Sequence, residues 1–168
     1  MGTHSMNGRT AIASQSLYFE DLSPGDTFLS TGRTVTETDV VNFAGVSGDF
    51  NQIHLDAEAA KDSIYGQRVA YGVLGLSMAT GLLDRLGIFR ESMAAMLEIE
   101  SWRFLAPVFI GDTVRLRLTI EQTRLTSSGD RGIVRRRLEL LNQRDEIVQS
   151  GVITVMALCR PAAPVASS

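Results

Sequence analysis

The sequence predicts a single α+β domain in which a curved antiparallel sheet wraps around one long apolar helix. Two observations support this fold class. Residues 70–87, "AYGVLGLSMATGLLDRLG", are apolar on nearly every side of a helix, which indicates that the helix is buried. After Met93 the apolar residues recur with a period of two through several long segments, the pattern of antiparallel strands with one face in water. A helix packed on such a sheet forms a two-layer domain.

Length and composition are those of an ordinary globular domain. The chain has 168 residues, of which 44% are hydrophobic and 21% charged, and its net charge is −3. A nucleic-acid-binding protein should concentrate Lys and Arg on one face, so this balance argues against nucleic acid as a partner. Cys159 is the only cysteine, which excludes an intrachain disulfide. No apolar run is long enough to span a bilayer, so we expect a cytoplasmic protein without a membrane partner.

The chain divides into one domain and the segments that flank it. With His4 assigned to a vector-derived leader, His54 is the only native histidine, and a metal site built from several histidines is excluded. The segments are the leader "MGTHSM" at residues 1–6, a flexible N-terminus at 7–17, the domain at 18–158 and a flexible tail at 159–168.

Two short helices are predicted ahead of the buried one. In "TVTETDVVNFAGVSGD", Thr36 or Thr38 precedes acidic residues in the pattern of a helix N-cap, and Gly45 and Gly48 end the helix. In "LDAEAAKDS", Asp56 caps a second short helix made of good helix formers.

Three or four long antiparallel strands follow the buried helix. They are predicted in "MLEIESWRFLAPVF", "DTVRLRLTIEQTRLT", "GIVRRRLELLNQ" and "EIVQSGVITVMAL", with the turns "SSGDRG" and "NQRDE" between the last three. The basic cluster Arg135-Arg136-Arg137 lies within one of them, and we assign it to a solvated face rather than to a patch for an anionic cofactor. A sheet of this kind around a central helix is the hotdog arrangement, whose open edge strand would pair in a dimer.

The segment "GVSGDFNQIHLDAEAA" gathers polar residues that can carry chemistry. Asp49 and His54 lie five residues apart on a glycine-flanked loop, and loops carry a large share of catalytic groups. A purely structural interpretation is also open, because Gly-Asp pairs and residues such as Asn51 are common in turns. The sequence contains no G-x-S-x-G elbow, GxGxxG loop, phosphate loop or HExxH motif. The remaining chemistry is proton transfer or water activation by Asp and His without a metal.

Three segments resemble the MaoC-like (R)-specific enoyl-CoA hydratases. "SGDFNQIHLDAEAA" is similar to the family signature S-G-D-x-N-P-hydrophobic-H-x-D, which an Ala-rich short helix follows. "YGQRVAYGVLGLSMATGLL" is similar to the family's central helix, with its entry glycine at Gly72, and "FLAPVFIGDTV" matches the pattern F-x-x-P-V-x-x-G-D-x-V. The resemblance covers roughly residues 18–158.

This resemblance implies hydration of trans-2-enoyl-CoA thioesters to (3R)-3-hydroxyacyl-CoA, or the reverse dehydration, without a metal or another cofactor. It implies a substrate carried on CoA or on an acyl carrier, and a homodimer or higher homo-oligomer whose pocket forms between protomers. By the same resemblance, Asp49 and His54 hold and activate the water, and Asn51 fixes the geometry of the loop. The N–H of Gly72 would bind the thioester oxygen, and Thr80 falls where the family carries a small hydroxyl residue near the catalytic pair.

Two residues depart from the family pattern. Gln52 replaces the proline after the asparagine, which removes a φ constraint from the loop. Tyr71 replaces the histidine before the entry glycine, either as a supporting hydrogen-bonding group or as a residue that shapes the acyl pocket. Two other functions stay open, namely an acyl-CoA thioesterase on the same fold and a non-catalytic acyl-binding subunit of a dehydratase heterodimer.

Overall fold

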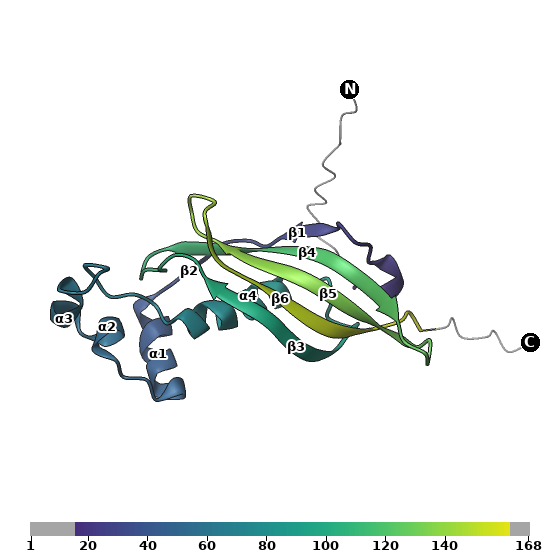
Figure 1. Cartoon of the computed structure of the whole chain (residues 1–168), viewed down its shortest axis with the longest axis horizontal. Coiled ribbons are helices and arrows are strands. Elements are labelled where there is room, and N and C mark those ends of the chain that lie inside the picture. The colour runs from purple at the N-terminus through teal and green to yellow at the C-terminus, as the bar shows by residue number, and fades with distance from the viewer. Residues whose placement is uncertain (1–15, 162–168) are drawn as a thin grey trace, which may run out of the picture.

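The sheet is built from four long strands and curves strongly (Figure 1). The computed structural model describes residues 16–161, so the predicted leader and most of both flexible segments lie outside the described residues. The long strands are all antiparallel to their neighbours: β3 (Met93–Phe104), β4 (Thr113–Leu125), β5 (Arg131–Leu141) and β6 (Ile147–Leu158). The short strands β1 (Thr27–Leu29) and β2 (Arg33–Thr34) pair with β4, and the order across the sheet is β1-β4-β5-β6-β3.

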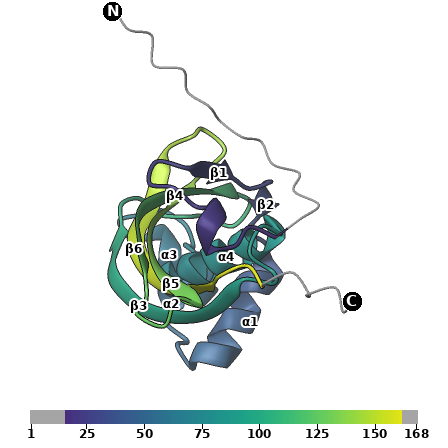
Figure 2. The same ribbon diagram turned by 90° about the vertical axis from the view of Figure 1, so that its right-hand side faces the viewer.

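The helix α4 (Gly72–Arg85) lies in the hollow of this sheet. Figure 2 shows β4, β5, β6 and β3 arching around α4. A short 3-10 turn at Phe19–Asp21 precedes β1. The helices α1 (Glu37–Ser47), α2 (Gln52–Leu55) and α3 (Ala57–Lys61) gather at one end of the sheet (Figure 1). A helix enclosed by a curved antiparallel sheet confirms the predicted α+β hotdog fold.

The inner face of the sheet and α4 share one hydrophobic core. Residues of β4 alternate between buried and partly exposed over most of the strand, as the period-two pattern predicted. Burying a side chain of this size is worth about 1.5–3 kcal/mol, so the core holds α4, and with it the residues at its N-terminus, against the sheet. The buried residues are Val114, Leu116, Leu118 and Ile120 from β4, and Leu74, Met78 and Leu82 from α4.

Local hydrogen bonds determine where α1 begins and ends. The Thr36 hydroxyl accepts a hydrogen bond from the Asp39 N–H at 3.2 Å, and the Asp39 carboxylate accepts one from the Thr36 N–H at 2.8 Å. This reciprocal cap identifies Thr36 as the N-cap of α1. The helix passes through Gly45 and ends at Gly48, which has a left-handed backbone with φ of 73°. The prediction that Gly45 also ends the helix was wrong, because Gly48 alone adopts the conformation that stops it.

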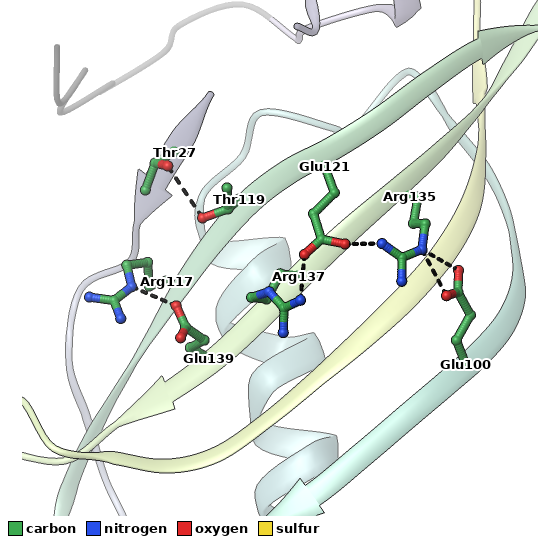
Figure 3. A network of polar contacts seen from close by, with 8 residues as sticks. All are labelled: Thr27, Glu100, Arg117, Thr119, Glu121, Arg135, Arg137 and Glu139. Atoms are coloured by element: carbon green, nitrogen blue, oxygen red, sulfur yellow. Dashed lines mark hydrogen bonds and ion pairs between the residues drawn. The ribbon is translucent and has the colours of Figure 1, made fainter. Parts of the chain in front are cut away.

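The outer face of the sheet carries a row of ion pairs (Figure 3). Arg135 on β5 reaches across β6 to Glu100 on β3, with Nε 2.8 Å from the carboxylate, and also pairs with Glu121 on β4. Arg137 binds the other oxygen of Glu121 at 2.7 Å. Each of these cations has a carboxylate partner, which confirms the solvated-face assignment for Arg135 and Arg137.

Arg136 is the exception in the basic cluster, and its assignment to a solvated face was wrong. Because side chains alternate along a strand, Arg136 points inward between its two neighbours and is only 2% exposed. Its guanidinium carbon lies 5.6 Å from the centre of the Phe89 ring, while its Nε and Nη1 atoms have no hydrogen-bond partner among the described residues. Burial lowers the pKa of Arg136 to about 10.

Replacing Arg136 with methionine should therefore stabilise the fold. Methionine removes a buried charge that has no carboxylate partner among residues 16–161, so the free energy of unfolding should rise by about 1–3 kcal/mol in urea denaturation at pH 7. The gain in stability should shrink above pH 10, where the folded wild type releases this proton while the unfolded chain, whose Arg136 has its ordinary, higher pKa, retains it. Arg137→Met is the control and should change stability by less than about 1 kcal/mol. An Arg136→Met protein less stable than the wild type would contradict this expectation.

Two neighbouring surfaces of the single chain expose apolar side chains. β3 is the long edge strand, and almost all of its residues are exposed, including Leu97 at 47% and Ile99 at 43%. One face of α4 is also open, with Val73 55% exposed. The prediction that α4 is buried on every side therefore fails for this face in the single chain, because the sheet encloses the helix from one side only. Among residues 16–161, the structure has no helix long and apolar enough to cross a membrane.

Candidate functional site

Asp49 lies on a short loop after α1. The prediction that His54 lies on the same loop was wrong, because Asn51 caps a short helix, α2, that contains His54. The left-handed Gly48 turns the chain out of α1, and the Asp49 N–H then donates to the Ser47 hydroxyl at 3.2 Å. The Asp49 carboxylate accepts a hydrogen bond from the Asn51 N–H at 3.1 Å. The Asn51 side chain in turn accepts one from the Ile53 N–H at 3.2 Å, which makes it the N-cap of α2. Asn51 thus shapes the loop from Asp49 into α2.

His54 lies in α2 and is oriented by a backbone group of another segment. Its Nδ1 atom is 2.7 Å from the Val69 carbonyl oxygen. A carbonyl can only accept, so Nδ1 carries the proton of the neutral imidazole. The Nε2 atom is then left with its lone pair and can accept a proton from water.

Tyr71 contacts both members of the predicted pair. Its hydroxyl donates to the Asp49 carbonyl oxygen at 2.6 Å, and its ring lies against the His54 imidazole with 3.8 Å between ring centres and 31° between planes. Tyr71 is only 4% exposed. Its burial, and to a lesser degree the charge of Asp49, raise the pKa of the Tyr71 phenol, so the hydroxyl stays protonated at neutral pH and remains a donor.

A cavity of about 400 Å³ opens beside His54. Gly72, the first residue of α4, lines the same cavity, and a β-carbon on Gly72 would come within 2.8 Å of the Phe104 ring. Asp49 is exposed and lies outside this lining. The other residues that line the cavity are Ile53, Tyr65, Val69, Ala70, Phe104, Leu105, Ala106, Pro107, Val108 and Gln149.

The backbone before α4 holds Gly72 at this cavity. The Ala70 N–H donates to the Val108 carbonyl at 2.8 Å, and Val69 forms a β-bridge with Phe109. α4 then starts at Gly72 with Tyr71 as its N-cap, and the Tyr71 side chain makes no capping hydrogen bond. The first N–H groups of a helix have no partner within the helix and favour negative charge, so this uncapped end suits an anionic oxygen.

Thr80 is not brought to this cavity. It lies further along α4, where its hydroxyl donates to the Ser77 carbonyl at 2.8 Å, and it lines a separate cavity of about 230 Å³ with Asp84 and Phe89. The structure therefore unites His54 and Gly72 in one cavity and connects them to Asp49 through Tyr71, while Thr80 stands apart.

Gln149 is a cavity residue that the sequence reasoning missed. It occupies β6, is 2% exposed, and donates from Nε2 to the Gly72 carbonyl at 3.1 Å. A signal for it exists in the sequence, because Gln149 falls on the same alternate positions as the buried Ile153 and Val155, on the otherwise apolar face of the strand. A glutamine at such a position needs a buried hydrogen-bond partner.

A proline at position 52 should be compatible with this loop. Gln52 is exposed and is the first residue of α2, where a missing N–H costs nothing, and Asn51 has the extended backbone (ψ of 132°) that a following proline requires. Gln52→Pro should raise the free energy of unfolding by about 0.4–1 kcal/mol in urea denaturation. Ile53→Pro is the matched control and should destabilise the protein, because it removes the N–H that binds Asn51. Loss of stability in Gln52→Pro would show that the loop does not tolerate the constraint.

Comparison with known proteins adds a consistent set of relatives. The family model "MaoC like domain" matches residues 21–139. The protein MaoC of Klebsiella aerogenes is 44% identical over 105 residues, which are 62% of this chain but only 31% of that protein. The (R)-specific enoyl-CoA hydratase of Rhodospirillum rubrum is 34% identical over 103 residues, which are 61% of this chain and 69% of that protein.

A solved structure shares the fold of nearly the whole chain. A monoamine oxidase regulatory protein from Archaeoglobus superposes with a TM-score of 0.81 at 35% identity, over 90% of this chain and all of that one. The shared fold thus extends beyond the residues matched by the family model.

Proposed function

Because the chain belongs to the MaoC-like dehydratase family, we propose that it hydrates trans-2-enoyl-CoA thioesters to (3R)-3-hydroxyacyl-CoA, or catalyses the reverse dehydration. The observation that carries this proposal is the common cavity of His54 and Gly72, with the Tyr71 ring against His54 and the Tyr71 hydroxyl bonded to the main-chain carbonyl of Asp49. A base and an oxyanion donor in one cavity are the two groups that addition of water to an activated alkene requires.

In the proposed reaction, Asp49 and His54 hold a water molecule above the β-carbon of the substrate. The pair removes one proton from the water as its oxygen bonds to the β-carbon, and it delivers a proton to the α-carbon. Negative charge develops on the thioester oxygen between these events, and the Gly72 N–H at the start of α4 stabilises it. A donor of this kind is commonly worth about 3 kcal/mol. In the proposed reaction Asp49 and His54 activate the water, which requires no metal, and the addition is redox-neutral, which requires no redox cofactor. Dialysis against EDTA should therefore leave the rate unchanged.

The substrate test compares unsaturated and saturated thioesters. Purified protein should consume the enoyl absorbance of crotonyl-CoA and form (3R)-3-hydroxybutyryl-CoA, identified by chiral chromatography, without releasing free thiol. Butyryl-CoA should be left intact. Release of CoA thiol from butyryl-CoA, or from crotonyl-CoA without hydration of the double bond, would show that the protein is a thioesterase and not a hydratase. A homogeneous preparation inactive on a panel of enoyl-CoA and enoyl-carrier thioesters would favour a non-catalytic subunit.

We further propose that the active form is a homodimer. The exposed edge strand β3 carries Leu97 and Ile99, and the adjacent open face of α4 carries Val73. A long apolar edge strand is an aggregation site unless another chain covers it, and pairing with the same strand of a second copy is the symmetric solution. Asp49 is exposed in the single chain, and in the proposed dimer the second copy would cover it and the water that it holds with His54.

A further inference from the structure

We infer that Gln149 is a positioning residue that keeps Gly72 aligned for its contact with the thioester oxygen. The inference rests on the proposed function, because it assumes that Gly72 binds that oxygen. Gln149 itself would act through Gly72 and not on the reacting atoms.

Both ends of the Gln149 amide are held by hydrogen bonds. Nε2 donates to the Gly72 carbonyl at 3.1 Å, and Oε1 accepts from the Trp102 indole N–H at 3.0 Å. Gln149 is 2% exposed. The amide is therefore a rigid link between β3, β6 and the first residue of α4, and the oxygen and nitrogen cannot exchange places without losing both bonds.

Two glycines make room for this link. A β-carbon on Gly75 would lie 2.2 Å from the Gln149 Nε2 atom, so Gly75 lets the amide rest against the first turn of α4. A β-carbon on Gly151 would lie 2.2 Å from the Trp102 ring and 2.4 Å from the Ser101 carbonyl oxygen, so Gly151 lets the indole cross β6. Contacts this short are not tolerated without movement, which means that the backbone is shaped around the Trp102–Gln149–Gly72 chain of hydrogen bonds.

Gly72 is a residue that needs such a restraint. A glycine loses more backbone freedom on folding than any other residue, and Gly72 stands at a helix end that no side chain caps. An oxyanion donor is effective only when it is already aimed at the position of the developing charge. The bond from Gln149 fixes the Gly72 carbonyl from outside the helix and so restricts the rotation of that residue.

Loss of this restraint should appear in kcat rather than in KM. Eleven other residues line the cavity, and they would supply most of the contacts to the acyl group and the CoA portion, so binding of the ground state should persist when the almost fully buried Gln149 is changed. The charge on the thioester oxygen is present only in the transition state, and misplacement of a group by about 1 Å can lower the rate about 100-fold. We therefore expect kcat to fall by about 10- to 100-fold, with KM within about threefold of the wild type.

The experiment uses the full chain with Gln149→Met, which keeps the length of the side chain and removes both hydrogen bonds. Crotonyl-CoA hydration gives kcat and KM, and the infrared carbonyl stretch of bound, unreactive butyryl-CoA reports how strongly the thioester oxygen is hydrogen-bonded. The wild type should shift this band to lower frequency, and Gln149→Met should reduce the shift. Trp102→Phe removes only the bond at Oε1 and should give a smaller loss of kcat. This variant tests the inference if Gln149→Met does not fold. Gln143→Met is the control, because Gln143 is an exposed glutamine in the β5–β6 turn, bonded to Asp112 and Thr113.

Each outcome bears on the inference separately from the proposed function. A lower kcat with a smaller carbonyl shift in Gln149→Met, and no change in Gln143→Met, supports it. An unchanged kcat, a higher KM alone, or a lower kcat with the full carbonyl shift overturns it. If the wild type shifts the carbonyl band of butyryl-CoA but does not hydrate crotonyl-CoA, the proposed function fails, and the difference in band position between wild type and Gln149→Met still decides the role of Gln149.

Discussion

Asp49→Asn and His54→Ala should each lower the rate of crotonyl-CoA hydration by about 100- to 10,000-fold. Asparagine keeps the shape of Asp49 and can still accept the Asn51 N–H, so the variant loses its charge and basicity but not its fold. Alanine at position 54 removes the Nε2 lone pair that the bond to Val69 leaves free. Stopped assays at high enzyme concentration would measure the residual rates, and thermal unfolding would verify that both variants fold.

The matched control for this pair lies in the same segment. Asp56 accepts hydrogen bonds from the N–H groups of Glu58 and Ala59 and caps α3. Asparagine is also a good N-cap, so Asp56→Asn should keep both its stability and its hydratase rate. An active His54→Ala protein would end the proposed mechanism, and an Asp49→Asn protein as active as Asp56→Asn would remove Asp49 from it.

Leu97→Glu combined with Ile99→Glu should convert the proposed dimer into a monomer. In a symmetric interface both substitutions occur twice, and they would place unpaired carboxylates next to one another on the paired edges of β3. Burying such charges without partners costs several kcal/mol, so the dissociation constant of the dimer should rise by at least about 100-fold. Size-exclusion chromatography with light scattering measures the change in mass.

The same double variant tests whether the dimer completes the active site. Loss of the second copy would leave Asp49 and the cavity beside His54 open to bulk water, and we expect hydratase activity to fall with the dimer fraction. Glu98→Gln, on the same strand, is the control and should remain dimeric and active. A wild-type protein that is monomeric and active at assay concentrations would refute the dimer, as would a fully active monomeric variant.

Local hydrogen bonds explain why much of the fold could be predicted. The Thr36 cap, the Asp56 cap and the left-handed Gly48 each depend on groups within four residues. The local sequence is therefore sufficient to predict them. The alternation in β4 depends only on which side of the sheet faces the core. The same alternation places the middle residue of Arg135-Arg136-Arg137 on the inward face of β5, as the structure shows. Its charge favours the solvated face in the sequence analysis, because a charged side chain is rarely buried.

The candidate site divides in the same way. The segment from Asp49 to His54 and the entry glycine Gly72 could be singled out from residue types, spacing and resemblance. The bond from Tyr71 to Asp49 spans 22 residues and the bond from Gln149 to Gly72 spans 77, and such partners depend on how the elements pack. The separation of Thr80 from the cavity likewise follows from the path of α4 across the sheet.

By itself, the sequence determined the α+β class, the long strands that follow the buried helix, and the segment that carries Asp49 and His54, because capping, turn formation and side-chain alternation act over a few residues. It did not reveal the short helix α2, in which His54 lies. Only the tertiary structure decided which side chains meet at the cavity. It orients the His54 imidazole through the hydrogen bond to the Val69 carbonyl and packs Tyr71 against that ring. It also places the Gln149 amide next to Gly72, where Gly75 has no side chain to block it. These contacts join residues far apart in the chain, and their geometry arises from the packing of α4 within the curved sheet.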